Sequence, residues 1–373
     1  MVAGAAAAPG ALERLGAGLD GRRGRVAATL LLAAVLAAMV ALMSLTGPWQ
    51  FMDRRVYDYL STTLPPALPA DGPLIVAIDE PSLAEVGRQW PWPREMHAQL
   101  IEALRKAGVR RIGFDIIFAE PSNPASDEAL AAAMGSDVVL AADESLIETP
   151  QATQIVRVEP LPQLTERGAV AGMAALVLDA DAAARRVPRY PDGFAARLIG
   201  ADNPPDVPPG ALMQAFGPAR TYPTVSYYQA LDPEDFLPPG TFSGRTVIVG
   251  LSMQSAAKTD MGGADQHATS WTTRTGRLVA GAEIHAAIFD NLRTKLFVTP
   301  ASAALGIASI AVAALAAASA TRRRTGWLTV VQAVVAAALA VAASFLLVRF
   351  GRFYVPPLAP AFALALGAGA RGA

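Results

Sequence analysis

The sequence of 373 residues contains no cysteine and only three histidines. The lack of cysteine excludes disulfides, thiolate metal sites, iron–sulfur clusters and cysteine nucleophiles. It leaves the compartment open, because a cysteine-free domain is compatible with either side of a membrane. A three-histidine zinc site would need His97, His267 and His285 together. Glu283 and His285 cannot chelate one ion as a pair, because a helix places side chains two residues apart at about 200°. We therefore expect no metal and no cofactor.

Charge is also scarce. Only 17% of the residues are charged, 53% are hydrophobic, and the formal net charge is −1. This balance argues against an ordinary soluble enzyme, and against a nucleic-acid partner, which requires a basic surface. The sequence also lacks the P-loop, H-E-x-x-H and G-x-S-x-G motifs, and residues 250–254 miss the last of these by their final residue. We expect no enzymatic activity in this chain.

Long apolar runs are the most prominent feature that is present. Residues 26–45 form a run of 20 uncharged residues, which as a helix would reach about 30 Å, the thickness of a bilayer core. Three more apolar runs lie near the C-terminus, and Pro356, Pro357 and Pro360 interrupt the last of them. Buried helices of a soluble protein are the alternative interpretation of such runs. The predicted organisation is a cytoplasmic tail at residues 1–25, transmembrane helices at 26–46, 298–320, 327–348 and 353–371, and an extracytoplasmic domain at 47–297.

Basic residues predict the orientation of these spans. Four arginines precede the first run between residues 14 and 25, and residues 322–324 are all arginine. Since short basic loops stay in the cytoplasm, both termini are expected there and the long domain is expected outside. Arg349 and Arg352 count against this orientation, because they would lie in the outer loop. A cleaved signal peptide is the rival interpretation of the first run, which exceeds the usual ~7–15 apolar residues and is followed by a poor cleavage site.

The domain between the first and second spans alternates strand-like and helix-like segments. Residues 74–78, LIVAI, are apolar at every position, which is typical of a strand buried on both faces. The succession of segments is βαβαβ, which favours a three-layer α/β domain with a largely parallel sheet. Further strands are predicted at residues 112–114, 138–141, 155–158, 174–178 and 246–249, and helices at 94–107, at 281–292 and from Ser126 onward.

Six short motifs in this domain resemble the type-2 CHASE domain, an extracellular sensory module of bacterial signalling receptors. They occur in the order of that family and cover nearly the whole outer domain. The family usually has an aspartate and a Thr-Pro pair after its last long strand. Asp260 fits the aspartate, but no Thr-Pro follows it before Gly281, so the conformation of this loop stays open. The six motifs are VAIDEPSL at 76–83, WPWPR at 90–94, GFDIIF at 113–118, PTVSY at 223–227, GRTVIVG at 244–250 and GAEIHA at 281–286.

The resemblance implies a sensor in the bacterial inner membrane with its sensory domain in the periplasm or outside the cell. In that family three trailing spans lead to a cytoplasmic output, commonly a class III adenylate or guanylate cyclase, otherwise a kinase or a diguanylate cyclase. This chain ends at Ala373 without such a domain, so we expect either a fragment of a longer receptor or a sensor that acts through a partner protein. The expected partners are an unknown extracytoplasmic ligand or protein, the lipid bilayer and a second copy of the chain as a homodimer, with no nucleic acid. The rival interpretation is a membrane-anchored outer enzyme or a structural membrane protein.

The topology of a parallel sheet predicts where a ligand would bind, because ligands settle at the carboxyl ends of the strands. Asp79 and Asp115 end two strands that we expect to be neighbours, so their carboxylates are expected to face one crevice. The competing interpretation is structural: Asp79 caps a helix, Asp115 binds loop amides, and the tryptophans wedge a loop against the sheet. The candidate ligand-binding residues are Asp79, Glu80, Trp90, Trp92, Arg94, Asp115 and Asp260, with Arg94 as the group that neutralises the acids.

The last predicted helix of the domain, residues 281–292, leads directly to the second span. Any movement of the sensory sheet would have to pass along it, and Thr299-Pro300 is expected to interrupt the helix before the membrane. Helix packing is the alternative role for its residues. The candidate residues for signal transmission are Glu283, Ile284, His285 and Ile288.

Overall fold

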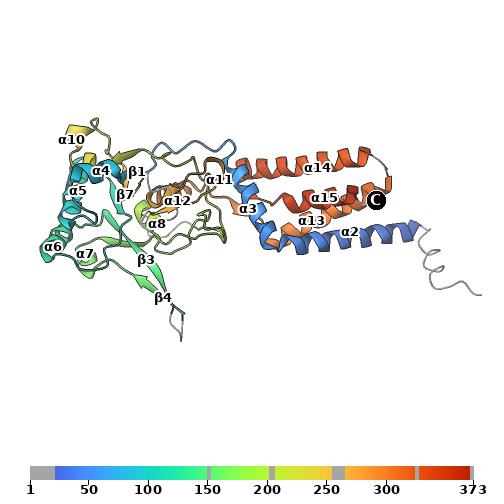
Figure 1. Cartoon of the computed structure of the whole chain (residues 1–373), viewed down its shortest axis with the longest axis horizontal. Helices are drawn as coiled ribbons and strands as arrows, with labels where there is room; N and C mark the ends of the chain where they lie inside the picture. Colours follow the sequence, from blue (N-terminus) through green and yellow to red (C-terminus); the bar gives the residue numbers. More distant parts are fainter. Residues whose placement is uncertain (1–21, 149–152, 201–205, 254–264, 324–326, 370–373) are drawn as a thin grey trace, which may run out of the picture. The chain divides into compact units, whose positions relative to one another are not determined.

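The computed structural model describes residues 22–148, 153–200, 206–253, 265–323 and 327–369. The chain forms two compact units (Figure 1). One comprises Met1–Tyr57 and Ala301–Ala373, and the other comprises Asp58–Pro300. Helix α3 (Gly47–Thr62) begins in the first unit and ends in the second.

The second unit is built on a seven-stranded sheet in the order β4-β3-β2-β7-β1-β6, with β5 also paired to β3. Every described pairing in it is parallel except that of β4 with β3. The prediction of a largely parallel sheet is therefore confirmed. The strands are β1 (Leu74–Ile78), β2 (Arg111–Phe114), β3 (Val138–Glu148), β4 (Thr153–Val158), β5 (Val170–Met173), β6 (Thr224–Ser226) and β7 (Thr246–Leu251).

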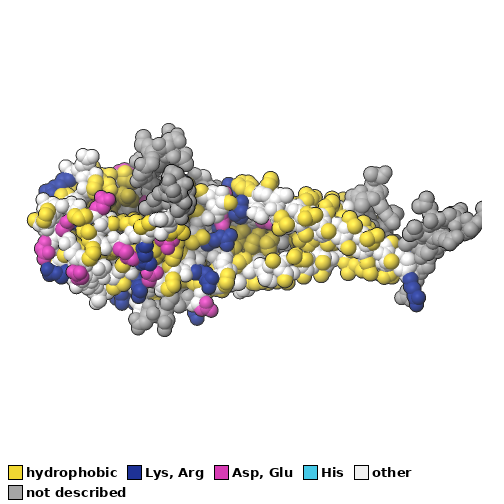
Figure 2. All heavy atoms as spheres, turned by 90° about the horizontal axis from the view of Figure 1, so that it is seen from below, with side chains coloured by type: hydrophobic (Ala, Val, Ile, Leu, Met, Phe, Trp, Pro, Cys, Tyr) yellow, Lys and Arg dark blue, Asp and Glu magenta, His cyan; other side chains and the backbone are white. Residues whose placement is uncertain are grey.

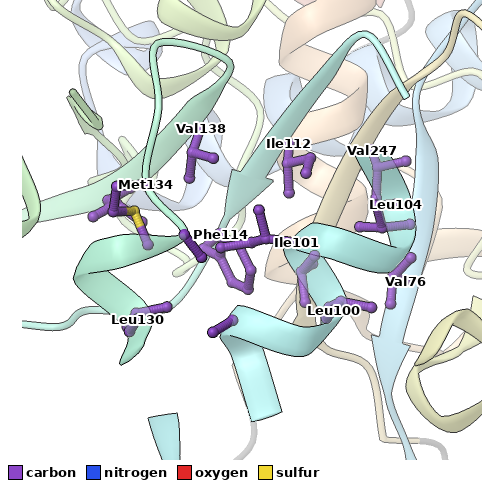
Figure 3. Close-up of a cluster of buried hydrophobic side chains, with 14 of the residues drawn as sticks. Val76, Leu100, Ile101, Leu104, Ile112, Phe114, Leu130, Met134, Val138 and Val247 are labelled. Carbon is purple, nitrogen blue, oxygen red and sulfur yellow. The ribbon is translucent and has the colours of Figure 1, made fainter. Parts of the chain in front are cut away.

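Helices cover both faces of this sheet, because alternate residues of each buried strand point to opposite sides. In β1, Val76 and Ile78 join one apolar cluster and Ile75 joins the other. Figure 3 shows the first cluster, where Leu100, Ile101 and Leu104 pack against the strands. The helices contributing to this cluster are α4 (Glu80–Val86), α5 (Arg94–Lys106), α6 (Pro124–Ala132), α7 (Pro162–Glu166) and α9 (Tyr227–Leu231).

The opposite face is covered by α8 (Phe194–Ile199) and α12 (Gly281–Thr294). Ile284 and Ile288 of α12 are buried in the second cluster, as the apolar stripe of this helix predicts. The helix ends at Thr294, with Lys295 in the left-handed conformation, so the break before the second span comes earlier than Thr299-Pro300. Short elements complete the unit: α10 (Pro233–Phe236), α11 (Thr272–Thr275), β8 (Gln266–His267), β9 (Val279–Ala280) and β10 (Thr299–Pro300).

Three local predictions were wrong. Strands β1 and β2 are not neighbours, because β7 lies between them and pairs with both. Residues 174–178 do not form a strand, since pairing with β3 ends at Met173 and only Leu178 makes an isolated bridge. The helix predicted to open at Ser126 is capped by Asn123, whose side chain accepts a hydrogen bond from the Ala125 amide at 2.9 Å.

Among its described residues, the first unit contains three helices that are long and apolar enough to cross a membrane, at Arg23–Ser44, Ala303–Ala320 and Val330–Gly351. Large apolar side chains point outward from them: Leu31 is 67% exposed and Val312 is 70% exposed. Figure 2 shows hydrophobic side chains over the surface of these helices. A surface of this kind suits contact with lipid. The elements are α2 (Arg22–Ser44), α13 (Ala303–Arg323), α14 (Trp327–Leu346), the π-helical turn η1 (Leu347–Gly351), β11 (Phe353–Tyr354) and α15 (Leu358–Gly369).

Small residues let the helices of this unit approach one another. Leu36 and Val40 of α2 pack with Ala314 of α13 and Ala363 of α15. Helix α15 has 12 described residues, which correspond to about 18 Å of helix, shorter than a bilayer core. Residues 370–373 lie outside the described part, so the fourth span stays a prediction.

Candidate functional site

A pocket opens at the carboxyl edge of the sheet, where the topology of parallel strands predicts a ligand. Asp115 directly follows β2, Asp143 lies in β3, and Leu251 ends β7. The pocket has a volume of about 470 Å³, within the range of small-molecule sites. We call it the carboxyl-edge pocket. Its polar lining residues are Asp115, Asp143, Asp265, His267 and His285.

Two carboxylates and two imidazoles meet in this pocket. His285 Nε2 lies 3.5 Å from Asp115 Oδ1, and the two side chains are only 5% and 10% exposed. His267 Nε2 lies 3.0 Å from Asp265 Oδ1. The carboxyl of Asp115 is also hydrogen-bonded to the side chain of Asp265.

Burial determines the protonation of this cluster. Burial raises the pKa of Asp115 well above its ordinary value of 3.8, and the neighbouring carboxylate of Asp265 raises it further. Burial alone would raise the pKa of Asp265 as well, but its hydrogen bond and charge interaction with His267 outweigh burial and lower that pKa. Burial lowers the pKa of His285 from 6.5 to about 4. At neutral pH the pocket therefore holds an ionised Asp265, a neutral His285 and an Asp115 that keeps its proton to an unusually high pH.

Two glycines let the pocket form. A Cβ added to Gly281 would lie 1.9 Å from Asp265 Oδ2, so only glycine lets this carboxylate lie over the first residue of α12. The positive end of the helix dipole favours the ionised carboxylate there. A Cβ at Gly250 would lie 2.9 Å from the Ala282 Cβ and 3.2 Å from the Asp115 Cβ. The end of β7 thus approaches α12 and β2 closely.

Asp79 and Glu80 belong to a different part of the sheet edge. Asp79 is the N-cap of α4: its Oδ1 accepts hydrogen bonds from the Ser82 amide at 3.1 Å and the Ser82 hydroxyl at 2.6 Å. Its Oδ2 accepts another from the Ser226 hydroxyl at 2.7 Å. Glu80 is the first residue of α4. The expectation that Asp79 and Asp115 share one crevice is wrong, because β7 separates their strands and Asp79 caps a helix.

The WPWPR segment is divided between the pocket and the core. Trp90 lines the carboxyl-edge pocket and packs edge-to-face on Trp92, with ring centroids 5.4 Å apart. Trp92 is buried and packs against Tyr227. Arg94 pairs with Asp127 at 2.7 Å and donates to the carbonyl of Glu120. Its expected neutralising role toward Asp79 and Asp115 is therefore replaced by a structural ion pair beside α6.

The remaining predicted residues lie around α12. Asp260 lies outside the described residues. Glu283 Oε2 accepts a hydrogen bond from the Arg220 amide at 2.7 Å, and burial raises the pKa of Glu283. Ile284 and Ile288 are buried against the sheet. Of the four candidate residues for signal transmission, His285 lines the carboxyl-edge pocket. Glu283 instead contacts Arg220, on another side of the helix.

Asp265 and His267 were not among the predicted site residues. Their only sequence signal is the spacing Asp-x-His before the helix, which in an extended segment places the two side chains on the same side. That spacing is common and carries little information without the fold. Among the described residues, no group of three or more His, Asp or Glu side chains is arranged to hold a metal ion.

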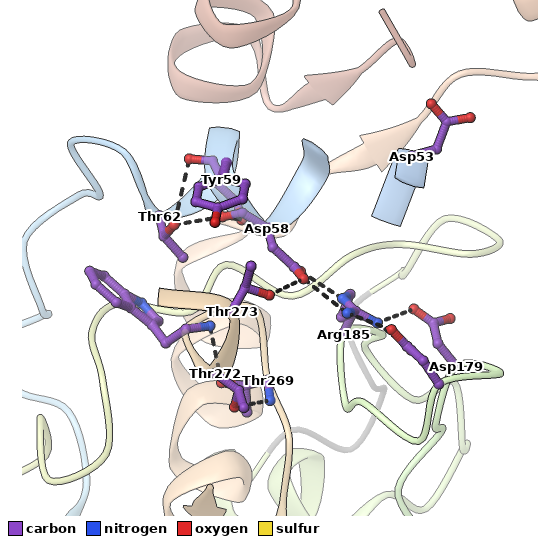
Figure 4. Close-up of polar contacts among 12 residues, drawn as sticks. Asp53, Asp58, Tyr59, Thr62, Asp179, Arg185, Thr269, Thr272 and Thr273 are labelled. Carbon is purple, nitrogen blue, oxygen red and sulfur yellow. Dashed lines mark hydrogen bonds and ion pairs between the residues drawn. The ribbon is translucent and has the colours of Figure 1, made fainter. Parts of the chain in front are cut away.

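A second polar cluster that sequence reasoning missed fixes the end of α3 in the second unit (Figure 4). Arg185 is only 2% exposed and binds Asp58 of α3 through two hydrogen bonds of 2.6 and 2.9 Å. It also donates to Asp181 at 2.7 Å and to Asp179 at 3.2 Å. Thr273 of α11 donates to Asp58 Oδ2 at 2.7 Å. Burial alone would lower the pKa of Arg185, but these hydrogen bonds raise it instead.

A chain of buried amides joins α3 to α12. The side chain of Asn291, on the last turns of α12, donates to the Gln214 carbonyl at 2.9 Å and accepts from the Gln214 amide at 2.8 Å. Gln214 Nε2 in turn donates to the carbonyl of Ser61 in α3 at 3.2 Å. The helix that follows the first span and the helix that precedes the second are therefore linked through Gln214 inside one unit.

Comparison with known protein families gives one match. The family model of the CHASE2 domain matches residues 32–343, which is most of the chain. Neither a search of curated proteins nor a search of solved structures finds a match. The expected resemblance to the type-2 CHASE domain is confirmed, and the chain belongs to the CHASE2 family, a sensory domain of signalling receptors.

Proposed function

We propose that this chain is the sensory and membrane portion of a bacterial transmembrane receptor whose stimulus binds in the carboxyl-edge pocket. The proposed stimulus is extracytoplasmic, and the proposed output is a class III nucleotide cyclase, or otherwise a kinase, a diguanylate cyclase or a partner protein. The chain itself is proposed to be non-catalytic. Membership of the CHASE2 family and three apolar helices support a membrane-associated sensor.

The observation that carries this proposal is the position of α12. His285, in its first half, lines the pocket, and Asn291, near its end, is hydrogen-bonded to the segment that holds α3. A ligand that displaces His285 would move a helix of 14 residues that leads toward the second span. Packed helices tend to shift between discrete arrangements rather than flex, which suits transmission of a two-state signal.

A reporter receptor tests this route. The whole chain is fused at its C-terminus to the catalytic domain of a class III cyclase, and cyclic nucleotide formation is measured per folded molecule. Ile288→Ala removes a buried side chain of α12 and should shift basal output. Ile101→Ala is the matched control, because Ile101 is equally buried on the other face of the sheet. Both substitutions should cost about 2–5 kcal/mol of stability. Ile101→Ala should leave the basal output per folded molecule unchanged. If Ile288→Ala also leaves basal output unchanged, α12 is a structural lid and not the transmission element.

The proposed topology is that of a multi-pass inner-membrane protein with both termini in the cytoplasm. The second unit, Asp58–Pro300, which we call the sensory unit, lies outside. The basic residues before the first span and at 322–324 support it. Reporter fusions at Gly24, at Thr325 and after Ala373 should report a cytoplasmic position, and a fusion at Gly200 an extracytoplasmic one. Cytoplasmic activity at Gly200 would overturn this orientation.

We also propose that the receptor acts as a homodimer, the commonest symmetric assembly. Crosslinking in membranes should give a species of twice the chain mass, and its absence at all crosslinker concentrations would favour a monomer.

A further inference from the structure

A second pocket lies on the face of the sheet that α8 and α12 cover. These two helices lie side by side (Figure 1), and the pocket opens between them and the loop that leads into α8. We call it the α8–α12 pocket. Its volume of about 300 Å³ suits a small organic molecule. It adjoins the carboxyl-edge pocket, because Ala175 and His285 line both.

Most of the lining of the α8–α12 pocket is apolar. Ile288 and Leu292 of α12 form one wall, and Phe194 of α8 and Met173 at the end of β5 form another. All four side chains are buried by the rest of the fold, so core packing fixes the walls. An apolar molecule that enters such a pocket is removed from water and gains the free energy of apolar burial.

The charged residues of this lining are balanced in sign. Among its described lining residues, only Arg189 and Asp206 carry a charge at neutral pH, and both side chains are exposed. One positive and one negative group give no net attraction for an ion of either sign. An ion placed against the apolar walls would also lose its hydration without a paired charge. The lining therefore favours a neutral ligand.

One polar side chain reaches the pocket from within the core. The side chain of His285 is 5% exposed, and burial lowers its pKa from 6.5 to about 4, so the imidazole is neutral at physiological pH. Its Nε2 faces Asp115 at 3.5 Å, and Nδ1 has no hydrogen bond with any residue that the structure describes. A neutral imidazole has one donor and one acceptor nitrogen. Nδ1 is therefore left for a ligand.

We propose that the α8–α12 pocket binds a small neutral alcohol or phenol with an apolar body. The body lies between Phe194 and the α12 side chains Ile288 and Leu292, and the hydroxyl is hydrogen-bonded to His285 Nδ1. A hydroxyl suits either tautomer of the imidazole, since it donates as well as accepts. This inference goes beyond the proposed function, because binding here requires no stimulus in the carboxyl-edge pocket.

The proposed ligand contacts the helix to which we assign signal transmission. His285, Ile288 and Leu292 are three and four residues apart in α12, so they lie on one face of the helix. A molecule in the α8–α12 pocket therefore contacts two turns of α12 from the side of α8. The pocket is a second route by which a small molecule reaches this helix.

The test is calorimetric titration of the full chain in lipid nanodiscs with 2-naphthol at about pH 7, where a phenol is neutral. Empty nanodiscs give the partition into lipid. 2-Methylnaphthalene has the same shape without the hydroxyl, and 2-naphthoate keeps the rings but carries a negative charge. 2-Naphthol should bind about 3- to 10-fold more tightly than 2-methylnaphthalene, the range of one neutral hydrogen bond, and more tightly than 2-naphthoate. Equal affinity of 2-naphthol and 2-methylnaphthalene, or tighter binding of 2-naphthoate, would overturn the proposal.

Variants locate the hydroxyl of the ligand. His285→Phe keeps an aromatic ring but removes both nitrogens, so it should abolish the preference for 2-naphthol over 2-methylnaphthalene. His267→Phe is the matched control, because His267 lines the carboxyl-edge pocket and not the α8–α12 pocket. Preference retained in His285→Phe, or lost in a folded His267→Phe, would place the hydroxyl elsewhere and overturn the assignment.

A measurement on the unaltered chain does not depend on the folding of a variant. A phenol that carries a diazirine is crosslinked by light, and the labelled peptides are identified by mass spectrometry. Peptides that contain Met173, Phe194 or Ile288 should be labelled, and 2-naphthol should reduce this labelling. Labelling that 2-naphthol reduces only in other peptides would contradict the assignment. The absence of saturable binding would overturn this inference alone, because the fusion receptor tests transmission through α12 independently.

Discussion

The buried contact between Arg185 and Asp58 allows a prediction of unusually large effect. Arg185 is the common partner of Asp58, Asp179 and Asp181, whose side chains are 0%, 5% and 15% exposed. Removing one member of a buried ion pair costs about 3–5 kcal/mol, because the other charge stays buried without compensation. Asp58→Asn should therefore cost about 3–5 kcal/mol. Arg185→Met should cost more, since it leaves several buried carboxylates without their cation.

The expected change is large enough to measure in the whole chain. For a unit of about 240 residues, 1 kcal/mol corresponds to about 2–4 °C in Tm. Asp58→Asn should thus lower the Tm of the sensory unit by about 6–20 °C, followed by tryptophan fluorescence in detergent micelles. The matched control is Asp192→Asn, because Asp192 pairs with Arg157 at 2.6 Å on a partly exposed surface. Breaking that pair should cost about 1 kcal/mol or less.

The pH dependence of the unfolding free energy gives a further test of Arg185→Met. In Arg185→Met the unpaired carboxylates have a raised pKa, so they take up protons in the folded state as the pH falls. The stability gap between this variant and the unaltered chain should narrow toward low pH. An Arg185→Met variant no less stable than Asp192→Asn would refute the reasoning, because it would show that the cluster is hydrated and contributes no more than a surface pair.

Three further outcomes are expected. Leu104→Ala should cost about 2–5 kcal/mol in unfolding free energy, and Leu64→Ala, at a position 71% exposed, about 0.5 kcal/mol or less. Gly281→Ala forces a Cβ onto the Asp265 carboxylate and should cost about 1–3 kcal/mol in the same assay; an unchanged value would mean that the carboxylate moves freely. Burial lowers the pKa of His97 from 6.5 to about 4. The buried neutral imidazole therefore contributes its full share of the unfolding free energy above about pH 6.5. About 3 kcal/mol should be lost as the pH falls toward 4, and His97→Gln should flatten this part of the profile.

Local sequence patterns predicted the elements better than their arrangement. The strand at 74–78 is apolar at every position, and in the structure all five residues of β1 are buried. The stripe of α12 likewise predicted its buried face. Nothing in either segment specifies that β7 inserts between β1 and β2, because the pairing joins residues far apart in the sequence. The expectation that Asp79 and Asp115 face one crevice failed for this reason.

Isolated charges were the hardest residues to interpret. In sequence, Arg185 and Asp58 are typical of solvated surface positions, since charged residues are rarely buried. Only the fold brings Asp58, 127 residues away, to the guanidinium. Asp265 and His267 were missed in the same way: their chemistry depends on the end of β2 and the first turn of α12, which approach them from distant parts of the chain.

Helix α12 lines the carboxyl-edge pocket and is hydrogen-bonded through Gln214 to α3, the helix that carries Asp58 of the Arg185 cluster. His285 of α12 lies at the carboxyl-edge pocket, and Asn291 is bonded through Gln214 to α3. Since α12 is a regular helix of 14 residues, a displacement at one end is carried to the other with little loss over about 20 Å. The Arg185 cluster holds Asp58 of α3 against the same unit with buried ion pairs, so α3 cannot move independently at low cost. Under the proposed function, a ligand at His285 would therefore shift the connections to the first and second spans together, which is the coordinated change that the proposed output would require.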